Sequence, residues 1–156
     1  MKELLDFSIT RDKIPLYSVD AGYLITPQIG YIKVNRFAAN TMKELRLKLA
    51  ELKSAGMKSL ILDLQGNGGG YLNTAIEMAD EFLPKEKLIV YTEGTNYPKE
   101  EHVSTSVGLW EKGNLVVLVD ESSASASEIV SGAMQDWDRG LLIGRRTFGK
   151  GLVQKP

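Results

Sequence analysis

The stretch Leu115-Val-Val-Leu-Val-Asp-Glu-Ser-Ser-Ala-Ser-Ala-Ser-Glu128 joins an apolar run to a cluster of small residues. The apolar run, Leu115–Val119, is typical of a buried strand, and a helix-like pattern begins at Ala126. Ser125, followed three residues later by Glu128, fits a capping box at the start of a helix. The stretch therefore predicts a strand, a turn and a helix, with Ser125 at the turn.

The same alternation of strand and helix signals continues outward from this stretch. We expect strands at 30–35, 59–64, 87–92, 114–119 and 141–143, and helices at 41–54, 72–83 and 126–137. Thr41 and Glu44 fit a capping box, Gly56 fits the end of the same helix, and His102 is expected in a polar, solvated loop. Repetition of this kind predicts an α/β fold with a mainly parallel sheet covered by helices.

Composition indicates an ordinary water-soluble domain. The chain has 156 residues, of which 43% are hydrophobic and 25% charged, so one core is expected. A formal net charge of −1 gives no electrostatic reason to expect nucleic acid as a partner. No apolar run reaches the roughly 18 residues of a membrane span, and the charged Met1-Lys-Glu-Leu-Leu-Asp start does not fit a signal peptide.

The residue types that are missing narrow the chemistry. The chain has no cysteine and one histidine, which argues against thiol enzymes and against zinc sites built from thiolates or several histidines. We expect neither a metal nor another cofactor. A nucleophile must then be a serine, threonine, lysine or carboxylate, and a serine hydroxyl needs a nearby base.

Lys150 is the candidate base. It lies between Gly149 and Gly151, and we expect it to be buried among the apolar residues Phe148, Leu152 and Val153. An apolar setting favours the neutral amine, which is the form that accepts a proton. The alternative is a solvated lysine in a turn, and Ser125 has a similar alternative as a simple helix cap. The residues alone leave both alternatives open.

Three motifs together closely resemble the carboxyl-terminal processing proteases, also called tail-specific proteases, which are Ser–Lys peptidases. The motifs are Leu62-Asp-Leu-Gln-Gly-Asn-Gly-Gly-Gly-Tyr71, Ser123-Ala-Ser-Ala-Ser-Glu-Ile129 and Gly144-Arg-Arg-Thr-Phe-Gly-Lys-Gly-Leu-Val-Gln154. The resemblance runs from about Ile14 to Gln154. It implies a crotonase- and Clp-protease-like core and a serine endopeptidase that cleaves protein tails with apolar C-terminal residues.

The resemblance also implies the roles of the site residues. It places the nucleophile at Ser125, the base at Lys150 and a supporting amide at Gln154. The oxyanion hole would use the N–H groups of Ala126 and Gly70, with Gly69 as the alternative glycine.

Two departures from the family pattern affect the glycine-rich loop. Family members usually carry arginine where this chain has Gln65, and often proline where it has Gly68. Glutamine cannot tie several carbonyl or carboxylate groups as a guanidinium can, so a looser oxyanion loop is expected.

By resemblance, the 156 residues are a single protease core domain that lacks the family's peptide-recognition (PDZ) domain and the last part of the core. We therefore expect weak or absent activity in the isolated fragment. The family mostly works outside the cytoplasm, in the periplasm or tethered to a membrane, and the same location is expected here.

Two other functions are compatible with parts of the sequence. Gly144-Arg-Arg-Thr-Phe-Gly-Lys150 matches the spacing of a nucleotide-binding phosphate loop, although Gly151 stands where such a loop needs serine or threonine. A non-catalytic module that binds extended peptides by strand addition is the second alternative.

Overall fold

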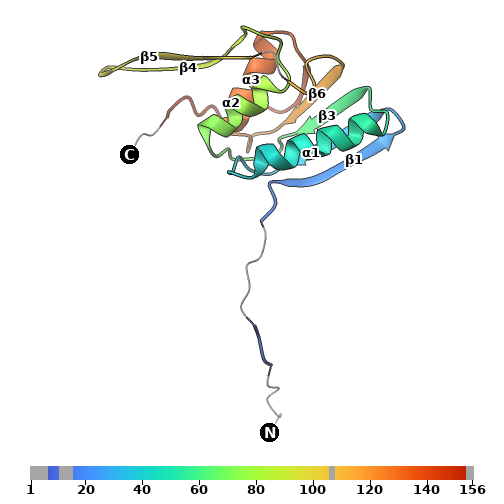
Figure 1. Ribbon diagram of the computed structural model, residues 1–156. Helices are drawn as coiled ribbons and strands as arrows, with labels where there is room; N and C mark the ends of the chain where they lie inside the picture. Colours follow the sequence, from blue (N-terminus) through green and yellow to red (C-terminus); the bar gives the residue numbers. More distant parts are fainter. Residues whose placement is uncertain (1–6, 11–15, 106–107, 154–156) are drawn as a thin grey trace.

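The computed structural model describes residues 7–10, 16–105 and 108–153 (Figure 1). In chain order, the elements within these ranges are β1 (Val19–Thr26), β2 (Ile29–Val34), α1 (Thr41–Ser54), β3 (Ser59–Asp63), α2 (Leu72–Asp80), β4 (Leu88–Gly94), β5 (Tyr97–Val103), β6 (Asn114–Val119), α3 (Ala126–Asp136) and β7 (Leu141–Gly144). The chain is a mixed α/β protein, as predicted. None of the helices in the described part is long and apolar enough to cross a membrane.

One five-stranded sheet has the order β1-β2-β3-β6-β7. Only the β1–β2 pair in this sheet is antiparallel, and β2, β3, β6 and β7 run parallel to one another. Asp63 of β3 is in register with Lys33 of β2 and Leu118 of β6, so these strands end at one edge of the sheet. That edge is where open parallel sheets usually carry their functional sites.

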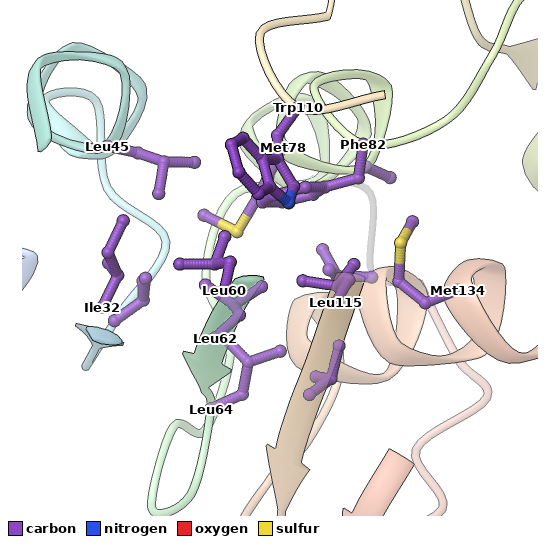
Figure 2. Packing of buried hydrophobic residues seen from close by; sticks show 14 of the residues in the cluster. Ile32, Leu45, Leu60, Leu62, Leu64, Met78, Phe82, Trp110, Leu115 and Met134 are labelled. Carbon is purple, nitrogen blue, oxygen red and sulfur yellow. The ribbon is translucent and has the colours of Figure 1, made fainter. Parts of the chain in front are cut away.

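The core lies between one face of this sheet and the helices. Ile32, Leu60, Leu62, Leu115 and Val117 alternate with less buried residues along β2, β3 and β6, and all of them are at most 4% exposed. Figure 2 shows Ile32, Leu60, Leu62 and Leu115 near side chains from the helices, which include Leu45 of α1, Met78 of α2 and Met134 of α3. Packing of this kind holds the carboxyl ends of β3 and β6 in fixed positions.

Strands β4 and β5 form a separate two-stranded antiparallel hairpin that extends away from the body of the molecule (Figure 1). The sequence did not predict β5, and the prediction that His102 lies in a loop is wrong because it pairs with Val90 in this hairpin. The reason is that Tyr97–Val103 is almost entirely exposed, so it has no buried face to produce an apolar alternation. β1 was missed as well, and most of its residues are also not buried.

The three predicted helices are present, and α1 has the predicted bounds. The predicted capping box of α1 is wrong, because Asn40 is the N-cap residue and makes no side-chain cap hydrogen bond. The Glu44 carboxylate instead accepts hydrogen bonds from the N–H groups of Ser18 and Val19, at 2.8 and 2.9 Å. Glu44 thus fixes the start of β1 to α1.

Candidate active site

Two loops follow the carboxyl ends of the neighbouring strands β3 and β6 and contact each other there. The glycine-rich loop, residues 64–71, follows β3 and leads into α2. The serine loop, residues 120–125, follows β6 and leads into α3. The candidate nucleophile and both candidate oxyanion donors lie on these loops or at their ends.

Ser125 has a strained backbone at the start of α3. Its φ is 56° and its ψ −113°, although it is not a glycine. A non-glycine residue in such a sparsely populated φ/ψ region costs of order 1–3 kcal/mol, and the conformation persists when the surrounding structure enforces it. Here the enforcement includes a hydrogen bond of 2.8 Å from the Ser125 N–H to the Glu128 carboxylate.

The other serines of the cluster have different surroundings. Ser123 and Ser127 are fully buried, and their hydroxyls donate to the carbonyl oxygens of Leu64 and Asn67, both at 2.8 Å. Ser122 is exposed, and Ser125 is half-buried. The two buried serines therefore act as loop anchors.

The glycine-rich loop approaches Ser125 closely. A Cβ added to Gly69 would lie 2.8 Å from Cβ of Ser125 and 3.0 Å from N of Ala126, and a Cβ added to Gly70 would lie 2.0 Å from O of Phe37. The N–H of Gly69 donates to Oδ1 of Asn67 at 2.9 Å. The N–H groups of Gly70 and Ala126, in contrast, make no hydrogen bond to another described residue.

Asp120 connects the glycine-rich loop with the serine loop. Its carboxylate accepts the N–H of Gly66 at 3.0 Å, the N–H of Ser122 at 3.0 Å and the N–H of Ser123 at 3.1 Å. These hydrogen bonds, that of Gly66 above all, hold the pKa of Asp120 below its ordinary value, although burial opposes the shift. The connection therefore depends on an ionised carboxylate.

The start of the glycine-rich loop has a cation that the sequence analysis did not consider. Lys33 of β2 places its Nζ 3.2 Å from Oδ1 of Asp63 and donates to the carbonyl oxygen of Gln65. The same carboxylate accepts the N–H of Gln65 at 2.8 Å and the hydroxyl of Tyr31 at 2.6 Å. Burial and this contact with Asp63 raise the pKa of Tyr31. The start of the loop is thus bound by a cation from β2, Lys33, while position 65, where family members usually carry arginine, is the neutral Gln65.

Lys150 and Ser125 line the same pocket, which has a volume of about 290 Å³. The other residues around this pocket are Gly70, Tyr71, Leu72, Ala126, Ile129, Leu152 and Val153. The structure therefore brings together four of the five predicted site residues. The fifth, Gln154, lies outside the described residues.

Glu128 holds the segment that carries Lys150. Its carboxylate accepts the N–H of Gly149 at 2.6 Å, the N–H of Lys150 at 2.9 Å and the hydroxyl of Thr147 at 2.9 Å, besides the N–H of Ser125. Burial alone would raise the pKa of Glu128, but these four donors outweigh it and lower the pKa. One ionised carboxylate thus joins the main chain of the nucleophile to that of the candidate base.

The expected burial of Lys150 is not observed. Lys150 is exposed, and the three apolar neighbours expected to cover it are exposed as well: Phe148 by 68%, Leu152 by 79% and Val153 by 51%. The prediction took apolar residue type as a sign of burial, but this segment follows the edge strand β7 and its residues 145–153 form neither helix nor strand. The same lack of a helix removes the nucleotide-loop alternative, which needs a helix N-terminus after the glycines.

Besides Lys33, sequence reasoning missed the roles of three residues that organise the site: Asn67, Asp120 and Glu128. Glu128 was noted as a helix cap, but its contacts with residues 147–150 are long-range and have no local signal. Asn67 was quoted within the glycine-rich motif without a role. Its position as a polar residue among glycines, in the loop that follows a buried strand, was the available signal.

Comparison with known proteins shows the family of this chain. The chain belongs to peptidase family S41, whose family model matches residues 28–156. It is 40% identical over 152 residues to the carboxyl-terminal-processing protease of Synechocystis, covering 96% of this chain and 35% of that protein. It is 38% identical over 151 residues to a probable CtpA-like serine protease of Staphylococcus epidermidis, covering 96% and 30%. The chain thus spans about a third of the length of these relatives.

Solved structures show the same fold. The photosystem II D1 C-terminal processing protease superposes with a TM-score of 0.82 at 29% identity, covering 94% of this chain and 41% of that one. A putative S41 protease from Bacteroides fragilis superposes with a TM-score of 0.76 at 20% identity, covering 93% and 43%, which supports the fold alone. The family and fold expected from the sequence are therefore confirmed.

Proposed function

We propose that this chain is the catalytic core of a serine endopeptidase that uses Ser125 as nucleophile and Lys150 as base. The observation that carries the proposal is the pocket where the strained Ser125 lies together with Gly70, Ala126 and Lys150. Strained backbone at a strand-to-helix turn is typical of exposed nucleophiles. The buried hydroxyls of Ser123 and Ser127 favour Ser125 among the serines.

In the proposed cycle, the neutral amine of Lys150 takes the proton of the Ser125 hydroxyl as Oγ attacks a peptide carbonyl. The N–H groups of Gly70 and Ala126 stabilise the oxyanion, since neither has a partner among the described residues and Ala126 is at the positive end of α3. Protonated Lys150 then gives its proton to the leaving amine, and water hydrolyses the acyl-enzyme. Gln154, by family resemblance, orients the lysine.

The proposed substrates are protein tails with apolar C-terminal residues. The pocket beside Ser125 supports this proposal, because Tyr71, Leu72 and Ile129 provide an apolar lining. A location outside the cytoplasm is part of the same proposal and rests on the family alone. The exposed segment around Lys150 supports the expectation that the isolated chain has weak activity.

The proposal is tested by incubating the chain with a serine-reactive fluorophosphonate and with an unstructured protein, using Ser125→Ala as control. We expect one adduct on Ser125, and loss of both labelling and cleavage in the variant. An adduct on Ser122 or Ser127 would contradict the assigned nucleophile. Binding of peptides without labelling or cleavage, even in a longer protein that carries this chain, would favour a non-catalytic peptide-binding module.

A further inference from the structure

Asn67 is a fully buried residue of the glycine-rich loop, at the contact of this loop with the serine loop. Its side-chain Nδ2 donates to the carbonyl oxygen of Val34, the last residue of β2, at 2.8 Å. Its Oδ1 accepts the N–H of Gly69 at 2.9 Å. Because one partner accepts and the other donates, the two contacts require this orientation of the amide. The side chain thus fixes the glycine-rich loop to the central sheet.

The main chain of Asn67 binds the serine loop and the first turn of α3. Its carbonyl oxygen accepts the N–H of Ala124 at 3.0 Å and the hydroxyl of Ser127 at 2.8 Å. Ala124 and Ser127 are the residues on either side of the Ser125–Ala126 pair. A single residue therefore contacts the sheet, the glycine-rich loop and the serine loop.

We infer that Asn67 is a positioning residue that sets the N–H of Gly70 relative to the N–H of Ala126, an inference that rests on the oxyanion hole proposed above. Two donors stabilise one oxyanion only when both lie about 2.7–3.1 Å from it. Asp120 joins the loops further from Ser125, through Gly66. Asn67 joins the two loops directly beside Ser125, through its hydrogen bonds with Gly69 and Ala124.

The test is the variant Asn67→Asp, which keeps the shape and the Oδ1 acceptor but replaces the donor to Val34 with a repelling oxygen. Asn96→Asp, an exposed position in the β4–β5 hairpin, is the matched control for the chemical change. The readout is fluorophosphonate labelling of Ser125, separated into the maximal rate and the concentration for half-maximal rate. The phosphonyl oxygen occupies the same place as the oxyanion.

We expect the maximal rate of Asn67→Asp to fall about 10- to 100-fold, less than the about 10²–10³-fold lost with a complete oxyanion donor. The half-saturating concentration should change less than about twofold, because binding is not the affected step. Lowering the pH should raise the rate relative to wild type, since the introduced carboxyl regains a donor on protonation. A folded variant with the wild-type maximal rate would overturn the inference.

Amide hydrogen exchange of the wild-type chain and the variants separates this inference from the proposed function. If wild-type Ser125 is not labelled even in a longer protein that carries this chain, the proposed function fails, and exchange at Gly69 and Ala124 still decides whether Asn67 couples the loops. Faster exchange at both amides in Asn67→Asp supports the coupling, whereas a change at Gly69 alone overturns it. If Asn67→Asp does not fold, the variant Ser127→Ala takes its place, because it removes one hydrogen bond to Asn67. It should speed exchange at both amides, and unchanged exchange at Gly69 would overturn the inference.

Discussion

The loops that hold Ser125 and the segment that holds Lys150 are fixed in very different ways. Asn67, Ser123 and Ser127 are fully buried and join the two loops to each other and to the ends of the central strands. The segment with Lys150 follows an edge strand and is mostly exposed. Its contacts with the rest of the molecule include three hydrogen bonds that the Glu128 carboxylate accepts, from Thr147, Gly149 and Lys150.

The difference indicates how the site is organised. The nucleophile and the oxyanion donors must be positioned within a few tenths of an ångström, and the packed core enforces their geometry. The lysine needs an environment that favours its neutral form, and the described residues leave it exposed. We expect changes at the base to affect chemistry without affecting stability, and changes at the loops to affect both.

The largest effect is expected for Lys150→Arg. A guanidinium keeps the positive charge but does not act as a base near neutral pH. The labelling rate of Ser125 should fall about 10²–10⁴-fold, the usual contribution of a general base. Because the side chain is exposed, the unfolding midpoint should not change. Lys112→Arg, at another exposed lysine, is the control, and a Lys150→Arg variant with near wild-type labelling would exclude Lys150 as the base.

The next effect is expected for Glu128→Gln, which changes the connection between the two regions. Gly149 and Lys150 donate to different oxygens of the carboxylate, so the amide keeps an acceptor for one of them and presents its own N–H group to the other. We expect a loss of about 1.5–3 kcal/mol in the free energy of unfolding. We also expect a labelling rate about 10- to 100-fold lower, because the base is misplaced.

Denaturant unfolding and labelling of the same samples measure both quantities for Glu128→Gln. Ser131→Ala, on the same helix, is the control, since its hydroxyl makes one long contact of 3.5 Å with the carbonyl of Glu128. A Glu128→Gln variant that loses stability but labels at the wild-type rate would show that this carboxylate does not position Lys150.

The fold could be predicted well from the sequence because its core elements are strongly patterned. The apolar runs of β3 and β6 and the amphipathic α1 carry their own signals, so their places were predicted within a residue. β1 and β5 were missed because they lie at the edge of the sheet or in the exposed hairpin, where pairing does not require a buried face.

The candidate site was predictable in its residues but less so in its environment. The motifs gave Ser125, Ala126, Gly70 and Lys150, which the structure brings to one pocket. Asn67, Asp120 and Glu128 each make contacts with residues far apart in the chain, and the local sequence does not identify the partners in such contacts. The exposure of Lys150 was not predictable for the same reason, since an apolar neighbour is buried only when another segment covers it.

A smaller effect is expected for Asp120→Asn and concerns pH. The folded-state pKa of Asp120 is lowered, so its contribution to stability is present above the unfolded pKa of about 3.9 and is lost as pH falls through the folded pKa. The variant should lower the free energy of unfolding by about 1 kcal/mol at pH 7. The difference from wild type should shrink below about pH 4, as the wild-type carboxylate is protonated.

Urea unfolding from pH 7 down to pH 3 measures this difference. Asp136→Asn is the control, since it makes the same change at an exposed residue at the end of α3. A constant difference between Asp120→Asn and wild type across the whole pH range would mean that the charge of Asp120 does not contribute to the connection with Gly66.

The smallest effect is expected for Glu121→Gln, although Glu121 directly follows Asp120 in the serine loop. Its carboxylate binds the guanidinium of Arg145, with Nε–Oε2 at 2.5 Å and Nη2–Oε1 at 3.1 Å, and this contact also connects the serine loop to the segment after β7. Both side chains are highly exposed, and water and salt screen such pairs strongly. Neither the unfolding midpoint nor the labelling rate should change measurably, in low or in high salt. If Glu121→Gln slows labelling in low salt and not in high salt, then an exposed ion pair helps to hold the segment that carries Lys150. Burial would then not explain the difference between this segment and the loops around Ser125.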